Sequence, residues 1–223
     1  MALIKSISGI RGTIGGEVNN NLTPIDAVKF AAAYGMWLKN NSKKENLTVV
    51  IGRDARISGK MVSSLVSNTL VGLGINVSDI GLSTTPTVEV AVALDAADGG
   101  IIITASHNPK QWNALKLLNA KGEFLNAAEG EKILAIAEKD GFIFAEVDDL
   151  GKYRKKQGYI NKHINEVLKL NLVDVEAIKK AKFKVVVDAV NSTGGIAIPA
   201  LLERLGVECV QLYCEPNGEF PHN

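Results

Sequence analysis

A polar hexapeptide follows one of the most apolar runs of the sequence. Ile101-Ile102-Ile103 leads directly into Thr104-Ala105-Ser106-His107-Asn108-Pro109. In an open parallel sheet, ligands bind outside the carboxyl ends of the strands. The pattern therefore places Ser106 at a ligand-binding edge. A serine hydroxyl is a poor nucleophile unless a neighbour activates it or its product is stabilised, so the surroundings of Ser106 decide whether it reacts.

A phosphate group is one product that such a loop could hold. On a serine it carries about −1.5 to −2 charges and needs cationic partners. Candidate cations are His107 and Lys116 nearby in the chain, and Arg11 and Arg53 farther away. From composition alone, a polar loop whose Ser-His pair has no chemical role is the simpler interpretation.

Several other chemistries are disfavoured by the motifs. The glycines at 9, 12, 15 and 16 do not match the G-x-G-x-x-G dinucleotide fingerprint, and the loop at 191–195 lacks the Lys-Ser/Thr of a phosphate-binding Walker loop. The serine is not within Gly-x-Ser-x-Gly, which argues against a hydrolase elbow. Adjacent residues at a strand end point apart, so Ser106 and His107 are a poor catalytic dyad for a serine hydrolase.

Charge and hydropathy also exclude some classes of partner. The 223-residue chain has 25 Lys+Arg and 24 Asp+Glu, which gives no electrostatic reason to expect nucleic acid or a membrane surface. No window approaches the ~18 consecutive apolar residues of a membrane span, and the N-terminus does not resemble a signal sequence. We expect a cytoplasmic protein. Cys209 and Cys214 lack zinc-site spacing; idle thiols are favoured, with a disulfide left open.

Strand-like and helix-like segments alternate, which predicts a three-layer α/β/α domain with a mixed, mainly parallel sheet. A glycine-rich loop is expected after a first strand at 2–7, and Thr23-Pro24 is typical of a helix start. Ser58 is expected to cap another helix. The predicted strands are 2–7, 47–51, 75–80, 101–103, 114–118, 184–188 and 207–213, and the predicted helices are 23–40, 58–71, 85–94, 126–139, 157–170, 174–181 and the segment ending at 205.

A change to basic composition around Lys152 to Lys156 indicates a domain boundary. We place the first domain at 1–152 and a second at 153–223. The second has only about two predicted strands, fewer than an ordinary sheet, and the sequence stops at Pro221-His222-Asn223 in a predicted loop. A partial second domain of the same type is expected.

Four ordered motifs resemble the α-D-phosphohexomutase family, which comprises phosphoglucomutases, phosphomannomutases and phosphoglucosamine mutases. The hexapeptide around Ser106 is similar to the family's phosphoserine loop. The others are Ser8-Gly9-Ile10-Arg11-Gly12, Gly52-Arg53-Asp54-Ala55-Arg56-Ile57-Ser58-Gly59, and Trp112-Asn113-Ala114-Leu115-Lys116, where Ala114 replaces the usual glycine. Val187 to Asn191 with Gly194-Gly195 resembles the opening of the family's second domain.

The resemblance implies an enzyme that moves phosphate between C1 and C6 of a hexose phosphate through a bisphosphate intermediate. Ser106 would carry the phosphoryl group and, through it, help to bind Mg²⁺, which favours few carboxylates plus phosphate. Lys116 would transfer a proton or stabilise charge, and Arg11 would contact the phosphoryl region. His107 and Asn108 would complete the loop, Asn108 and Arg11 as substrate-binding residues. Positioning and positive charge are what phosphoryl transfer needs most.

The same resemblance sets limits. The family's third and fourth domains, its Asp-Gly-Asp metal loop, its sugar-recognition loop and its C-terminal phosphate-binding loop have no counterpart here, so further Mg²⁺ ligands are expected downstream. The chain looks like an N-terminal fragment that is inactive alone. An alternative is a non-catalytic module that self-associates through its incomplete second domain. Arg53, Asp54 and Arg56 are interpreted as a charged strand-to-helix turn that braces the reactive loop. Thr104 favours a glucose or mannose substrate over glucosamine only weakly.

Overall fold

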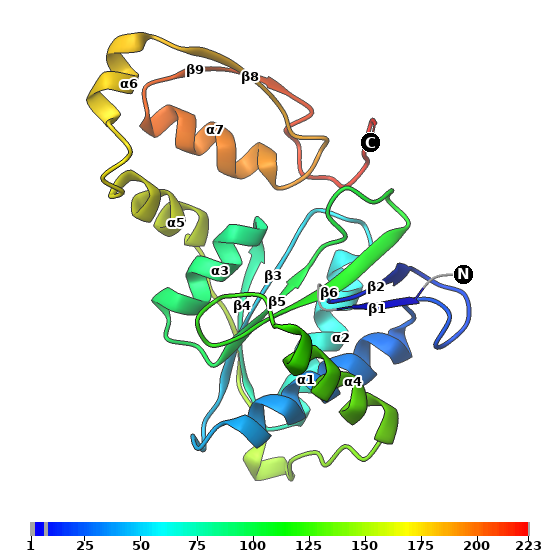
Figure 1. Ribbon diagram of the computed structural model, residues 1–223. Coiled ribbons are helices and arrows are strands. Elements are labelled where there is room, and N and C mark those ends of the chain that lie inside the picture. The colour runs from blue at the N-terminus through cyan, green and yellow to red at the C-terminus, as the bar shows by residue number, and fades with distance from the viewer. Residues whose placement is uncertain (1–2, 7–8, 223) are drawn as a thin grey trace.

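The computed structural model describes residues 3–6 and 9–222. Met1, Ala2, Ile7, Ser8 and Asn223 lie outside the described residues, so the ends of the strand predicted at 2–7 and the serine of Ser8-Gly9-Ile10-Arg11-Gly12 are not tested. Figure 1 shows a large first unit and a smaller second unit that follows it in the chain.

Across the described residues, seven strands form one mixed sheet in the order β1-β2-β6-β5-β3-β4-β7. The strands are β1 (Leu3–Ser6), β2 (Gly9–Thr13), β3 (Thr48–Arg53), β4 (Asn76–Leu82), β5 (Gly99–Ile103), β6 (Trp112–Leu118) and β7 (Tyr153–Lys155). β5, β3, β4 and β7 are parallel neighbours, whereas β1, β2, β6 and β5 pair antiparallel. The α/β class and the mixed sheet are confirmed, with a larger antiparallel part than expected.

Helices cover both faces of this sheet, which accounts for the unbroken burial of β5. One core joins the sheet to α1 (Pro24–Asn41), α2 (Gly59–Gly72) and α4 (Ala127–Lys139), and a second core joins it to α3 (Thr85–Leu94). Thr23 caps α1 in a reciprocal capping box with Asp26, and Pro24 opens the helix as predicted.

The glycine-rich loop predicted at the N-terminus is largely a strand. Gly9 and Gly12 belong to β2, and only Gly15 and Gly16 follow in a turn. A Cβ on Gly9 would lie 2.2 Å from the Leu115 carbonyl oxygen. The glycine therefore permits a close approach of β2 to β6, a long-range contact that local composition does not encode.

The second unit holds α5 (Tyr159–Leu168), α6 (Val175–Ala181), β8 (Lys184–Asp188), α7 (Gly194–Arg204) and β9 (Glu208–Leu212). β8 and β9 form a parallel two-stranded sheet. Val186 is 62% exposed, so this small sheet covers its apolar side chains far less than the first one does.

The segment between the units begins with a short 3-10 helix, η1 (Val147–Asp149), before β7. β7 lies just after the predicted boundary and adds to β4 of the first sheet. The division into 1–152 and 153–223 stays a prediction.

Cys209 and Cys214 are both free and partly exposed. The two cysteines are therefore free thiols, as favoured, and do not form the disulfide that was the alternative. Among the described helices, none has the length and apolarity to cross a membrane.

Candidate active site

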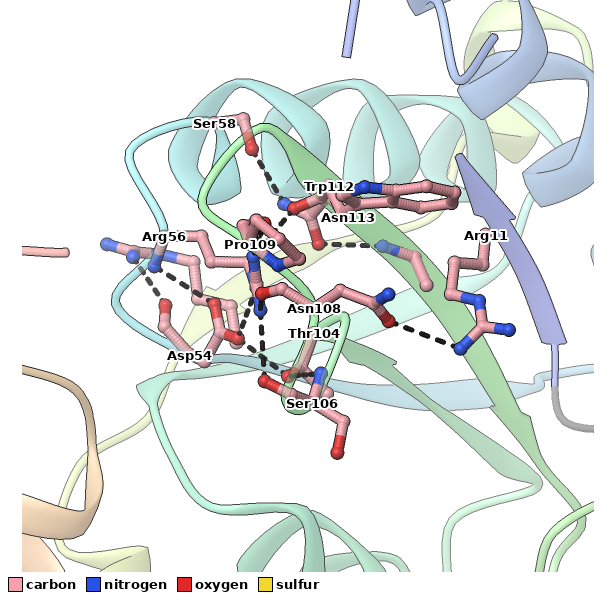
Figure 2. Close-up of polar contacts among 12 residues, drawn as sticks. Arg11, Asp54, Arg56, Ser58, Thr104, Ser106, Asn108, Pro109, Trp112 and Asn113 are labelled. Carbon is pink, nitrogen blue, oxygen red and sulfur yellow. Dashed lines mark hydrogen bonds and ion pairs between the residues drawn. The ribbon is translucent and has the colours of Figure 1, made fainter. Parts of the chain in front are cut away.

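A buried arginine supports the loop that carries Ser106. Arg56 is 1% exposed and lies in the turn between β3 and α2. Its Nη1 donates to the carbonyls of Pro109 (2.8 Å) and Trp112 (2.9 Å), and its Nη2 donates to those of Ser106 (2.9 Å) and Asn108 (2.6 Å). Figure 2 shows this fan of bonds from one guanidinium to one loop. The expected brace is thus present.

The fifth donor of this guanidinium is also used. Arg56 Nε donates to Asp54 Oδ2 at 3.1 Å. A guanidinium has five N–H donors in a fixed planar fork, and here each has an acceptor. Burial lowers the pKa of Arg56 from its ordinary value, and the neighbouring Asp54 opposes that change. Arg56 is therefore saturated by the protein and has no donor left for a ligand.

Asp54 extends the support to the backbone of Ser106. Its Oδ2 also accepts from Thr104 Oγ1 at 2.6 Å, and Thr104 Oγ1 accepts from the Ser106 amide at 3.1 Å. Asp54 and Thr104 are both 7% exposed. A buried relay from Arg56 through Asp54 and Thr104 thus fixes the N–H and the carbonyl of the same residue, Ser106.

The backbone of Ser106 is left-handed, with φ of 56°. This region is unfavourable for a residue with a Cβ, and such residues persist where the surrounding structure holds them. Ser106 follows β5 at its carboxyl end, as predicted, and is exposed. In Figure 2 its hydroxyl points away from the Arg56 fan. The loop is held from inside and presents Oγ outward.

Arg11 reaches the loop from a different strand. It lies in β2 opposite Ala114 of β6, and its Nη1 donates to Asn108 Oδ1 at 3.2 Å. The guanidinium is half-buried, and this is its only described side-chain bond. Two of the predicted site residues, Arg11 and Asn108, are thus brought together beside Ser106.

Lys116 lies on the same face of the sheet as Ala114, but no described contact joins it to the loop. It is two residues from Ala114 along β6, so both side chains leave one face of the sheet. Its Nζ lies 5.7 Å from the centre of the Phe124 ring. Burial raises the pKa of Glu89 in α3, while the charge of Lys116 lowers it. No contact between Lys116 and Ser106 is found in the described part of the chain.

His107 is exposed, and among the described residues no partner for its side chain is found.

The motif around Lys116 anchors the far end of the loop. Asn113 is buried and its Nδ2 donates to Ser58 Oγ at 2.9 Å. Ser58 precedes α2 as predicted, but its side chain does not cap the helix; it accepts from Asn113 instead. The predicted cap is wrong because the Ser58 backbone is helical, with φ of −71° and ψ of −13°, and not in the extended conformation of a capping residue.

The described residues do not form a metal site by themselves. No group of three or more His, Cys, Asp or Glu side chains suited to a metal is found within residues 3–6 and 9–222. The carboxylate of Asp54, which supports the loop, already accepts from Arg56 and Thr104. These residues alone therefore do not fit a Mg²⁺ site.

Sequence reasoning missed two residues beside the loop. The ring of Phe220 lies 5.0 Å from Arg56 Cζ, and Gly218 packs on the Ala55 backbone. Both come from the end of the second unit. Their only sequence signal was the turn-forming Pro216-Asn217-Gly218, which predicts a turn and not its partner.

Comparisons with known proteins give two family models. Residues 3–143 match "Phosphoglucomutase/phosphomannomutase, alpha/beta/alpha domain I", and residues 158–223 match domain II of the same description.

Individual relatives agree with these models. A phosphoglucomutase/phosphomannomutase of Thermococcus kodakarensis is 39% identical over 212 residues, covering 94% of this chain and 46% of the relative. A phosphoglucosamine/phosphogalactosamine mutase of Sulfurisphaera tokodaii is 32% identical, covering 92% and 43%. The structure of a putative phosphomannomutase from Thermus thermophilus superimposes with a TM-score of 0.80 at 26% identity, covering 96% and 46%. The chain thus spans slightly less than half the length of these proteins.

Proposed function

This chain belongs to the α-D-phosphohexomutase family, and on that premise we propose that it supplies the phosphoserine part of a hexose-phosphate mutase active site. The reaction moves phosphate between C1 and C6 of a hexose phosphate. The observation that carries the proposal is the Ser106 loop, whose backbone is fixed from within by Arg56 while its hydroxyl is exposed.

The transfer itself needs little from the protein beyond geometry and charge. The phosphoryl group on Ser106 Oγ passes to a free hydroxyl of the sugar monophosphate. The Oγ–P bond breaks, a new P–O bond forms to the sugar oxygen, and the proton of the sugar hydroxyl is passed on to the Ser106 Oγ that the phosphoryl group leaves. The resulting bisphosphate then returns its other phosphoryl group to Ser106, so serine is phosphorylated again and no oxidant or reductant is involved.

Each neighbouring residue has a proposed role in that exchange. Arg11, held at Asn108, is the cation that contacts the phosphoryl oxygens. Lys116 reaches from the same sheet face as Ala114, the β-partner of Arg11, to take the hydroxyl proton or to balance the developing charge. His107 is exposed beside Ser106 and completes the loop around the reacting groups. These roles rest on position and charge type.

The sugar is proposed only as a class. The Thermococcus relative is named for glucose and mannose phosphates, and the Sulfurisphaera relative for the amino sugars. Thr104 favours the first pair weakly. Its hydroxyl is occupied by Asp54 and the Ser106 amide, so it acts on the loop and has no described route to the sugar. Dependence on Mg²⁺ stays a prediction.

A second proposal is self-association through the small β8–β9 sheet. Val186 is 62% exposed and Leu212 is 43% exposed, and uncovered strands are templates for pairing. Sedimentation of the purified chain tests this: a strictly monomeric species at high concentration contradicts it.

The mutase proposal is tested with the chain alone and with a chimera, in which residues 1–223 are joined to the rest of the Thermococcus relative beyond its matched region. We expect the chimera to interconvert glucose 1-phosphate and glucose 6-phosphate and to carry one phosphoryl group by intact mass. Ser106→Ala should abolish both. The chain alone should show no appreciable turnover. A folded chimera whose Ser106→Ala variant still turns over would refute the role of Ser106.

A further inference from the structure

The end of the second unit lies against the support of the reactive loop. In Figure 1 the C-terminal segment returns from the second unit to the loop between β5 and β6. Phe220 is half-buried, and its ring centre lies 5.0 Å from Arg56 Cζ. The Arg56 side chain is 0% exposed. With its five donors directed at the protein, the guanidinium still has its flat faces free for an aromatic contact.

The approach of this segment is specified by a glycine. Gly218 is buried, with φ of 79°, and a Cβ there would lie 2.2 Å from the Ala55 carbonyl oxygen. Both the backbone conformation and the contact exclude a larger residue. The segment is therefore seated on the turn that contains Arg56.

The second unit holds the segment through two hydrogen bonds made by Asn191. The Gly218 amide donates to the Asn191 carbonyl at 3.0 Å, and Asn191 Nδ2 donates to the Glu219 carbonyl at 2.8 Å. Asn191 follows β8. A further ion pair joins Lys110 of the reactive loop to Glu219 at 3.2 Å, but both side chains are about three-fifths exposed, so it contributes little.

We propose that Phe220 is a positioning residue for the Ser106 loop. It stacks on Arg56, which binds the carbonyls of Ser106 and Asn108, and so it couples the seating of the second unit to the geometry of the phosphoryl-carrying serine. This inference rests on the proposed function for its chemical meaning, but the coupling itself is measurable in the chain without any turnover.

Hydrogen exchange of the chain tests the coupling. The Ser106 and Asn108 amides both donate within the loop, to Thr104 Oγ1 and to the Ala105 carbonyl, so their exchange rates report loop opening. We expect Phe220→Ala to accelerate both by roughly three- to tenfold, the factor that a partly desolvated cation–π contact implies. Phe220→Tyr should restore protection and the ring-current shift of the Arg56 Nε–H resonance, whereas Phe220→Leu should not restore that shift.

Two further variants make the test selective. Gly218→Ala should open the loop with Phe220 intact, because it lifts the segment from Ala55. Phe183→Ala removes a phenylalanine of the second unit that is 54% exposed and should leave the loop unchanged. The Ala189 amide, bonded to the Leu212 carbonyl, reports whether the second unit stays folded.

Unchanged loop exchange in Phe220→Ala, with a folded second unit, would overturn the inference. Equal loss of protection at Ala189 and in the loop would also overturn it, since the effect would then be general unfolding. The mutase proposal fails by a separate measurement, which is turnover without Ser106. The two failures are therefore distinguishable.

Discussion

The inner and outer sides of the Ser106 loop are built in opposite ways. On the inner side, the side chains of Arg56 and Asp54 are 0% and 10% exposed, and every guanidinium donor has an acceptor. On the outer side, Ser106 and His107 are exposed, and Arg11 has one described bond, to Asn108. The charged groups that hold the loop are thus separate from the outer groups, which the proposed function assigns to a phosphorylated ligand.

This separation has a physical reason. A buried charge must be fully paired, because an unpaired one costs several kcal/mol, so a saturated arginine cannot also bind substrate. A group that binds a transferring phosphoryl must keep donors free for the moment when charge develops. Inner substitutions are therefore expected to affect stability, and outer ones to affect transfer.

The largest effect is expected for Arg56→Met. It leaves four carbonyls and the Asp54 carboxylate without their buried donor, which should lower the free energy of unfolding by about 3–5 kcal/mol. Arg56→Lys should recover little, since an ammonium cannot reproduce the planar fork. Urea unfolding of the chain measures both.

Arg53→Met is the matched control, because Arg53 is the last residue of β3, is half-buried next to the same turn, and donates to one carbonyl, that of Asp54. It should lower the stability by no more than about 1 kcal/mol. Equal losses at Arg53 and Arg56 would mean that the whole turn, and not the fan of bonds, supports the loop.

The next largest effect should come from the outer side. Arg11→Met removes the cation at Asn108 and should slow turnover of the chimera about 10²-fold, as loss of one charge-stabilising donor does. The free energy of unfolding should change by no more than about 0.5 kcal/mol. Turnover and urea unfolding are measured together.

Arg154→Met, at an exposed arginine of β7, is the control and should change neither quantity. A large stability loss in Arg11→Met with turnover preserved would place Arg11 with the inner, structural group.

Much of this arrangement could be predicted from the sequence, for identifiable reasons. The apolar run before Thr104 indicates a strand buried on both faces, and that alone places Ser106 at its end. The turn at Arg53, Asp54 and Arg56 was expected to brace the loop. Its acceptors were not predictable, because they lie about fifty residues away along the chain.

The antiparallel half of the sheet was harder to predict. The contact of Arg11 with Asn108 depends on β2 pairing with β6 in one register, and no local pattern sets a register between segments a hundred residues apart. Phe220 was missed for the same reason. A single phenylalanine near a turn forms no periodic pattern, so the sequence does not indicate that it contacts Arg56.

A smaller effect is expected from the backbone of Ser106. Its φ of 56° is unfavourable for a serine, so Ser106→Gly should raise the free energy of unfolding relative to Ser106→Ala by about 1 kcal/mol. Both variants should lack phosphate and turnover. Urea unfolding of the two variants gives the difference. Equal stability would indicate that the inner bonds do not force this conformation on the loop.

The smallest effect concerns Glu89, and it decides whether Lys116 is free for chemistry. Burial raises the pKa of Glu89 above its ordinary value, against the opposing charge of Lys116. A carboxyl with a raised pKa in the folded chain contributes stability that is present below its unfolded pKa and is lost as pH rises through the folded one. Glu89→Gln should therefore be more stable, relative to the wild type, at pH 7 than at pH 4.

Because Glu89 is partly exposed, the change should stay within about 0.5 kcal/mol, and urea unfolding at the two pH values measures it. An exposed carboxylate of α4, altered by Glu131→Gln, is the control. If Glu89→Gln instead loses stability as pH rises, the attraction between Glu89 and Lys116 exceeds the burial cost. Lys116 would then be held by α3, on the side of the structural charges, and Arg11 would be left as the cation that faces the phosphoryl group.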